Sequence, residues 1–475
     1  MRLLEVVFVL IALGLLIAQN VRAVERKYVL ALFAAGLSTL VLSGVLGQLR
    51  WQIVPAGLVF AVSSLLLPRR AFSHAAVRSI GILLGAVFVA IGVLLALGLP
   101  VLTLPAPDGP HAVGSTSVSL IDESRDNAFF GAPDEKRDVY VQLWYPGVVA
   151  EGGPVPRVKT LWEELHRADL DLFTLFTRYL RGVKTHSYED IPLSSAQPSY
   201  PVIVFSHAIV SFAEQNTLLM EHLASHGYVV VGISHTYASM RVISSTGTAV
   251  YPNLDRVNSA SAEFDAMTAE VGRRIERAGS PEERASLQLE QYERATGLNE
   301  LTAIWVDDLR FVLDQIARLP AFDDRIDVDR VGLLGMSFGG GAITEFCKVD
   351  ARCRAALNMD GGLFGERQRE PLEVPYLSLI REGRSTDYLL LTSRSDYYEI
   401  EVEGTTHLDF TDDTVVLPIL KWFGLTGSIA AERVIEITNT VALRFFDSYL
   451  RGAPKPRFDG EFPELTVEMN GYAGE

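Results

Sequence analysis

The stretch VGLLGMSFGGGAITEF, residues 331–346, places Ser337 among five glycines, after a short apolar run and before a segment with helical patterning. Residues 335–339, Gly-Met-Ser-Phe-Gly, fit the pattern G-x-S-x-G, a sharp strand-to-helix turn that exposes the serine hydroxyl. Glycines are needed there because side chains would collide with the neighbouring strand and helix. A glycine-rich turn with an inert serine is the alternative. The strand predicted before the turn and the helix predicted after it favour a nucleophile.

Short apolar runs alternate with amphipathic segments along most of the chain after residue 105. The apolar runs predict strands at residues 139–146, 201–207, 228–234, 330–336 and 355–360. Between them, segments such as 214–225 and 301–319 carry apolar residues three and four positions apart, which is typical of helices. This repetition of strand and helix predicts an α/β fold, a mostly parallel sheet flanked by helices.

A serine nucleophile needs a base, and in folds with this turn the base follows the serine in the chain. His407 is the only histidine beyond Ser337, and it follows a strand-like run. For the acid that orients it, Asp360 ends a predicted strand, whereas Glu382 and Asp387 follow the next strand. We favour Asp360, because site residues belong at the carboxyl ends of parallel strands and two glycines follow it. A structural cap is its alternative role.

An oxyanion hole needs two backbone N–H groups, one from the residue after the nucleophile and one from a loop after an earlier strand. Phe338 meets the first requirement, and Ile209 is the candidate for the second. We expect His207, in the same loop as Ile209, to hydrogen-bond the loop backbone. His222 and His226 have a zinc-like spacing, but the glutamate that follows the first histidine of an H-E-x-x-H motif is absent, and the motif supplies no third ligand. We therefore interpret that pair as structural and predict no metal site and no cofactor.

Residues 1–104 differ physically from residues 105–475, which we expect to form the catalytic domain. Uncharged windows span residues 6–21, 28–49, 51–68 and 79–107. Because a membrane span needs about 20 apolar residues, the second and fourth windows are long enough, and the first and third are marginal. We expect a transmembrane anchor of about four helices. A signal peptide is the alternative for the first window, but further spans follow and no small-residue cleavage site stands out.

Charge is unevenly distributed between these two parts. The first 105 residues carry a net charge of +6 and the remaining 370 carry −22. An acidic body argues against a nucleic-acid partner, since phosphate binding depends on Lys and Arg. Basic residues cluster after the first and third windows, so the positive-inside rule places those loops in the cytoplasm and residues 105–475 outside the cell membrane. There the only two cysteines, Cys347 and Cys353, predict a disulfide, with buried thiols as the alternative.

Two further segments have distinct compositions. Residues 157–186 include an amphipathic stretch that would serve either as a lid over the site or as an ordinary packing helix. Residues 253–300 are rich in Glu, Arg and Ala, which indicates a solvated helical insertion.

Several motifs together resemble the plasma-type platelet-activating-factor acetylhydrolase family of α/β-hydrolases, including its bacterial membrane-anchored members. In chain order these motifs are VFSHAIV, LASHGYVVVGISH, GLLGMSFGGG, LNMDGG and GTTHLDFTD. The resemblance implies a calcium-independent serine esterase that removes short or oxidised acyl chains from phospholipids and uses no cofactor. Carried over by motif, it implies a nucleophile, an acid, a base and two oxyanion donors: Ser337, Asp360, His407, Phe338 and Ile209.

The chain departs from the family pattern at three positions. The family often has glycine where this chain has Ala208 and Val210, and often histidine where it has Met336. Val210 is expected to narrow the acyl pocket. Three functions therefore remain open: an esterase acting on membrane lipids, a carboxylesterase or polyester hydrolase acting on non-lipid esters, and a non-catalytic sensor or partner-binding domain. The sequence predicts no particular oligomeric state.

Overall fold

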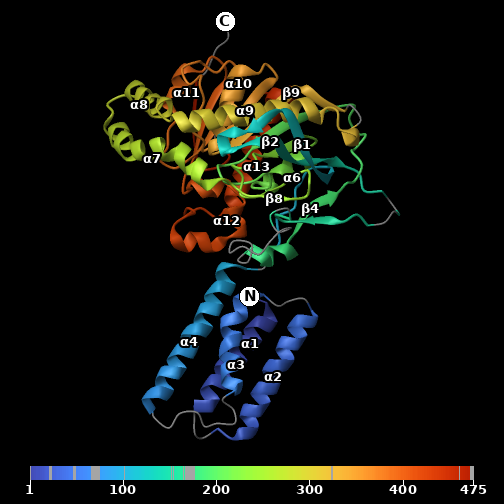
Figure 1. The fold of residues 1–475 in the computed structure, drawn as a ribbon, viewed down its shortest axis with the longest axis vertical. Coiled ribbons are helices and arrows are strands. Elements are labelled where there is room, and N and C mark those ends of the chain that lie inside the picture. The colour runs from blue at the N-terminus through green and yellow to red at the C-terminus, as the bar shows by residue number, and fades with distance from the viewer. Residues whose placement is uncertain are drawn as a thin grey trace. The chain divides into compact units, whose positions relative to one another are not determined.

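A computed structural model describes residues 2–20, 24–46, 50–65, 75–100, 102–150, 152, 155–163, 165, 177–322, 325–458 and 460–470. The chain divides into two compact units, shown in Figure 1. The helical unit comprises Met1–Thr103 together with Val416–Phe423. The α/β unit comprises Leu104–Val415 and Gly424–Glu475. A short segment far along the chain, Val416–Phe423, therefore groups with the N-terminal helices.

The helical unit is built from four mutually packed helices, drawn in blue in Figure 1. Their bounds are α1 Leu3–Asn20, α2 Arg26–Val45, α3 Val54–Leu65 and α4 Ala75–Gly98, with the 3-10 helices η1 Trp51–Ile53 and η7 Pro418–Phe423. Two stretches, Arg26–Val45 and Ser79–Gly98, are long and apolar enough to cross a membrane. The apolar helices at Leu3–Ala18 and Trp51–Ser63 are shorter. The basic loops on which the predicted orientation depends lie largely outside the described residues.

A buried ion pair joins parts of the helical unit that are distant in sequence. The Arg50 guanidinium donates to Glu5 Oε1 at 2.6 Å and to the Leu99 carbonyl at 2.6 Å. Both charged side chains are almost fully buried. This pairing satisfies two charges that would otherwise be costly to bury among apolar helices.

The α/β unit contains a sheet of eleven strands in the order β13-β12-β11-β10-β9-β5-β6-β2-β1-β4-β3. The run from β6 to β12 is parallel, while β13, β2 and β1 join it in antiparallel pairs. The strands are β1 Ala112–Asn127, β2 Ala132–Gly147, β3 Val158–Thr160, β4 Lys184–Glu189, β5 Tyr200–Ser206, β6 Val229–Ser234, β9 Ile326–Met336, β10 Cys353–Met359, β11 Tyr376–Arg381, β12 Tyr397–Val402 and β13 Leu465–Asn470. The small strands β7 Val242–Ile243 and β8 Ala249–Val250 form a separate hairpin.

Helices cover both faces of this sheet, which explains why its central strands are continuous apolar runs. The principal helices are α6 Thr217–Ser225, α7 Leu254–Arg277, α8 Pro281–Glu293, α9 Thr296–Ile316, α10 Phe338–Val349, α11 Asp387–Thr392 and α13 Ala431–Arg451. In β5, Val202 and Val204 enter one core with α9 and α10, while Ile203 and Phe205 enter the other with α6 and α13. Burial on both faces is typical of parallel strands. The sheet and its covering helices form an α/β-hydrolase architecture, as the sequence predicted.

The two compositionally distinct segments have different structures. The described part of residues 157–186 contains the short strand β3 and the first half of β4, which lie at the sheet edge. Most of its amphipathic stretch, residues 166–176, lies outside the described residues, so the lid remains a prediction. Residues 253–300 contain α7, α8 and the first turn of α9.

Candidate active site

Ser337 lies at the turn between β9 and α10. Its backbone has φ 56°, and its N–H donates to the Met359 carbonyl of β10 at 2.9 Å. Glycine is required on both sides of it. A Cβ at Gly335 would lie 2.4 Å from the Gly339 carbonyl oxygen, and one at Gly339 would lie 2.1 Å from the Ser206 carbonyl oxygen. The glycines therefore let the turn pack directly against the end of β5.

The two partners of Ser337 follow other parallel strands. Asp360 comes directly after β10, has φ 53°, and donates its N–H to the Leu379 carbonyl of β11 at 2.8 Å. His407 begins the 3-10 helix η6 His407–Phe410, which follows β12. The preceding Thr406 caps that helix, since Thr406 N–H donates to Asp409 Oδ2 at 2.7 Å. All three side chains thus stand at the carboxyl edge of the parallel sheet.

The structure brings these three side chains into one hydrogen-bonded chain. His407 Nε2 lies 2.9 Å from Ser337 Oγ, and His407 Nδ1 lies 2.5 Å from Asp360 Oδ2. An ionised carboxylate only accepts, so Nδ1 carries the hydrogen and Nε2 of the neutral ring is free to accept the serine proton. This is the arrangement that activates a serine hydroxyl for attack on an ester carbonyl.

The loop after β5 lies beside the N-terminus of α10. The N–H groups of Ala208 and Val210 donate to Gln215 Oε1 at 2.8 Å and to the Ala238 carbonyl at 2.9 Å. Among the hydrogen bonds of the described residues, none uses the N–H of Ile209 or of Phe338. These two free donors are the ones that the sequence proposed for the oxyanion hole.

The family model of platelet-activating factor acetylhydrolase, isoform II, matches residues 99–453, a span that includes the serine, the acid and the histidine. The chain belongs to this family. Curated relatives named platelet-activating factor acetylhydrolase support the assignment. The protein from Cavia porcellus is 24% identical over 73% of this chain and 78% of its own length, and that from Canis lupus familiaris is 23% identical over 73% and 77%.

A solved structure supports the same chemistry. The ferulic acid esterase from Streptomyces cinnamoneus superposes with a TM-score of 0.59 and 25% sequence identity, covering 77% of this chain and 98% of the esterase. Family and structural neighbour together make this chain a carboxylic-ester hydrolase of the serine esterase and lipase type. The non-catalytic interpretation is therefore not supported.

Val210 marks one departure from the family pattern. It has φ 55°, a left-handed conformation that glycine adopts freely and that a β-branched residue rarely adopts. His207 links this loop to Ser239. Its Nδ1 lies 2.5 Å from the Ala208 carbonyl, and its Nε2 lies 2.7 Å from Ser239 Oγ. His207 is fully buried, and its hydrogen bond to the loop backbone agrees with the structural role predicted for it.

Two arginines that the sequence analysis did not identify hold Asp360. The Arg384 guanidinium lies 2.9 Å from Asp360 Oδ1 and also donates to the Asp360 carbonyl and, at 2.7 Å, to the Gly361 carbonyl. Arg381 Nη1 lies 3.2 Å from Asp360 Oδ2. Burial by itself raises the pKa of Asp360, but Arg384 and the hydrogen bond from His407 outweigh it and lower that pKa to about 2. The signal in the sequence is the REGR motif at the end of β11, next to the strand that carries Asp360.

The alternative acids have other partners. Asp387 forms a bidentate ion pair with Arg284, with N···O distances of 3.0 and 2.9 Å. Glu382 Oε2 accepts the Gly404 N–H at 2.9 Å. Among the described residues, neither carboxylate forms a hydrogen bond with His407, whose Nδ1 faces Asp360.

The two cysteines lie where α10 gives way to β10, at the opposite end of both elements from Ser337 and Asp360. Cys347 and Cys353 form a disulfide with a Cα–Cα distance of 5.2 Å. The bridge closes the short connection between the helix that begins at Ser337 and the strand that leads to Asp360.

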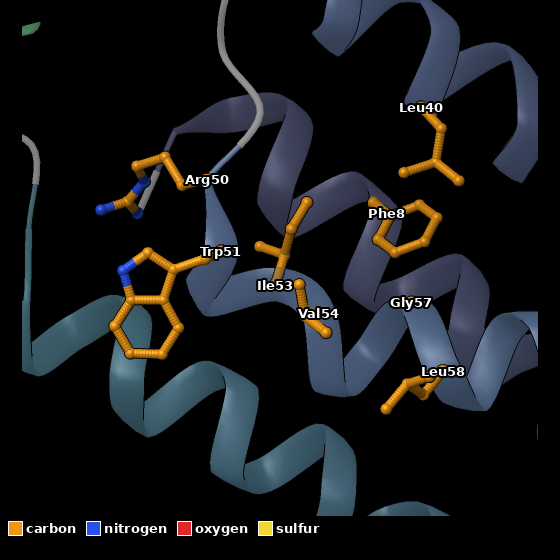
Figure 2. A pocket seen from close by; sticks show the side chains of 8 residues that line it. All are labelled: Phe8, Leu40, Arg50, Trp51, Ile53, Val54, Gly57 and Leu58. Carbon is orange, nitrogen blue, oxygen red and sulfur yellow. The ribbon is translucent and has the colours of Figure 1, made fainter. Parts of the chain in front are cut away.

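The helical unit has a separate pocket of about 420 Å³, shown in Figure 2. Its lining is apolar except for Arg50, whose guanidinium is already committed to Glu5 and Leu99. None of its lining residues is Ser337, Asp360 or His407.

Proposed function

We propose that this protein hydrolyses short or oxidised acyl esters of phospholipid-like substrates, with Ser337 as nucleophile, His407 as base and Asp360 as orienting acid. One observation carries the proposal: the unbroken hydrogen-bonded chain from Ser337 Oγ through His407 to Asp360, at 2.9 and 2.5 Å. The relatives named platelet-activating factor acetylhydrolase favour phospholipid-like substrates over other esters.

The first half-reaction forms an acyl-enzyme. Ser337 Oγ attacks the ester carbonyl while its proton passes to His407 Nε2, and Asp360 stabilises the imidazolium that results. The N–H groups of Phe338 and Ile209 hold the oxyanion of the tetrahedral intermediate. His407 then gives the proton to the departing alcohol oxygen.

The second half-reaction regenerates the serine. A water molecule attacks the acyl-enzyme as its proton passes to His407, and collapse of the second tetrahedral intermediate releases the carboxylic acid. Every proton transfer in these two half-reactions passes through His407, so the proposed mechanism requires no cofactor.

We also infer that the helical unit anchors the enzyme in a membrane as a multi-pass segment, with the α/β unit on the extracytoplasmic side. The length and apolarity of Arg26–Val45 and Ser79–Gly98 support the anchor. The basic residues after the first and third windows support the orientation. Protease added to intact spheroplasts should digest the α/β unit, whereas digestion only after lysis would contradict this orientation.

Fluorophosphonate labelling followed by peptide mapping tests the catalytic assignment. The label should be found on Ser337, and Ser337→Ala should abolish labelling and lower ester hydrolysis by several orders of magnitude. Ser245→Ala, which changes an exposed serine elsewhere, is the matched control. Near-normal hydrolysis by Ser337→Ala would refute the triad.

A second candidate substrate class comes from the structural neighbour, which is a ferulic acid esterase. A panel of esters separates the two proposals: phosphatidylcholines with an acetyl or a palmitoyl group at the second glycerol carbon, and a feruloyl ester. Preference for the acetyl phospholipid supports the leading proposal. Preference for the feruloyl ester would instead support a general carboxylesterase.

A further inference from the structure

His222 and His226 lie one turn apart on α6, and the structure supplies the third ligand that the sequence lacked. Asp108, which precedes β1, brings its carboxylate to the two rings. Asp108 Oδ1 lies 3.1 Å from His222 Nδ1 and 3.7 Å from His226 Nε2, and the three ligand atoms all lie within 4.8 Å of one another.

The backbone around Asp108 is held firmly against the end of α6. Gly109 N–H donates to Ser225 Oγ at 3.2 Å, and His111 N–H donates to the Ser225 carbonyl at 3.1 Å. A Cβ on Gly109 would lie 2.4 Å from Ser225, so glycine is needed for this approach. Asp108 is therefore positioned by contacts on its C-terminal side that are independent of its own side chain.

Hydrogen bonds also orient the imidazole rings. His226 Nδ1 lies 2.9 Å from the His222 carbonyl, which can only accept, so Nδ1 carries the hydrogen and Nε2 directs its lone pair toward Asp108. Such a hydrogen bond from the second ring nitrogen is typical of histidines that bind metals. The His222 side chain is 9% exposed, and its other nitrogen, Nε2, has no hydrogen-bond partner among the described residues.

We propose that Asp108, His222 and His226 bind one divalent transition-metal ion, with Zn²⁺ as the best match. Ligands about 2.1 Å from a tetrahedral zinc ion stand about 3.4 Å from each other, and the two distances to Asp108 bracket that value. Two imidazoles and one carboxylate suit zinc, whereas calcium takes six to eight oxygen ligands. The Asp108 side chain is 77% exposed, so the ion can enter from solvent and keep water as its fourth ligand.

Neighbouring charges are compatible with a bound cation. Arg451 lies close by, but its guanidinium donates to the carbonyls of His226 and Gly227 and is paired with Asp447 at 3.1 Å. The ion would add a bond between α6 and the segment that leads into β1. It would act as a structural clamp at the start of the α/β unit, separate from the triad.

Zinc titration of the full-length protein in detergent, after removal of metals with EDTA, tests the proposal. The wild type should bind one Zn²⁺ per chain, and Co²⁺ should give the visible absorption of a tetrahedral site. Asp108→Asn and His226→Asn should each weaken zinc binding by at least about tenfold. Asp134→Asn and His186→Asn, which change an exposed aspartate and a histidine outside the cluster, should bind as the wild type does.

Thermal unfolding provides a readout that distinguishes ligand loss from misfolding. Zinc should raise the melting temperature of the wild type but not that of Asp108→Asn, while the two metal-free proteins should melt at similar temperatures. Zinc binding by Asp108→Asn with wild-type affinity, or no stoichiometric binding by the wild type, would overturn the proposal.

Discussion

Ser337 and Asp360 both hold a left-handed backbone conformation, with φ of 56° and 53°. For residues other than glycine this conformation costs about 1–3 kcal/mol and persists only where the surroundings enforce it. Here β10 and β11 enforce it, because they accept the N–H groups of Ser337 and Asp360. In this conformation both side chains reach His407.

The orienting role of Asp360 is testable by an isosteric change. Asp360→Asn should lower kcat by about 10⁴-fold, because the amide favours the wrong imidazole tautomer of His407. Asp387→Asn is the control, since its carboxylate is paired with Arg284, and it should change kcat little. Steady-state kinetics on a water-soluble short-chain ester compares the two. A large loss confined to Asp387→Asn would transfer the role of the acid to that residue.

Arg384 acts on the reaction through Asp360. Arg384→Gln should lower kcat by roughly tenfold with little change in KM, because it frees the Asp360 carboxylate and leaves two carbonyls without their donor. Arg381→Gln should have a smaller effect, since the Arg381 side chain is 42% exposed and its ion pair is screened by water. Equal effects of the two substitutions would contradict a specific positioning role for Arg384.

Arg384→Gln should also change how the free energy of unfolding depends on pH. The pKa of Asp360 is lowered from 3.8 to about 2, so its ionised form stabilises the fold above pH 3.8, and this contribution is lost as the pH falls toward 2. Without Arg384 the pKa of folded Asp360 should rise toward its unfolded value, so Arg384→Gln should lack this contribution at neutral pH and its stability should depend less on pH. Urea unfolding between pH 3 and 6 should show Arg384→Gln less stable than Arg381→Gln at pH 6 but losing less stability on acidification.

At the scale of elements, the disulfide ties the end of α10 to the start of β10. The double variant Cys347→Ser, Cys353→Ser should lose about 2 kcal/mol of unfolding free energy, the value expected for closing a short loop. Urea unfolding measures this loss. Intact mass under non-reducing conditions checks the bridge itself, and two alkylatable thiols in the native enzyme would rule it out.

Strands and helices could be predicted from the sequence where burial gives their apolar residues a regular spacing. The strands β5, β6, β9 and β10 are continuous apolar runs because both faces are covered, and α9 repeats its apolar residues every three or four positions. Strands at the edge of the sheet were harder to predict. β3 and the first half of β4 lie within residues 157–186, where the sequence suggested only a lid or a packing helix. Edge strands bury little, so their pattern is weak.

In the whole molecule, the segment Val416–Phe423 is flanked in sequence by residues of the α/β unit, but it groups with the helical unit. It exposes Trp422 and Phe423, and its Ile419 packs against Gly98 of α4. A shortened chain beginning at Leu104 should fold, because the α/β unit has its own two cores. It should nevertheless aggregate unless Trp422 and Phe423 are changed to serine, since these two exposed aromatic side chains would lie beside Ile419, which loses its contact with Gly98.

Esterase assays on soluble and on membrane-held esters distinguish the roles of the two units. The shortened chain with Trp422→Ser and Phe423→Ser should keep its activity on short water-soluble esters. If the helical unit is the membrane anchor proposed above, the shortened chain should lose relative activity on esters held in a membrane, because tethering raises their effective concentration. Light scattering and parallel assays on both ester types provide the measurement. An unchanged ratio of the two activities would show that the anchor contributes nothing to substrate access.

Features with a local physical cause could be predicted from the amino-acid sequence. Alternating apolar runs and amphipathic segments predict the covered parallel sheet, the glycines around Ser337 predict the turn, and chain order leaves His407 as the one candidate for the base. Which side chains come together depends on how the elements pack. Arg384 reaches Asp360 because β11 lies beside β10, and Asp108 reaches His222 because the segment before β1 packs on α6. Such contacts join residues far apart in the chain, and no local pattern records them because they form only when separate elements pack together.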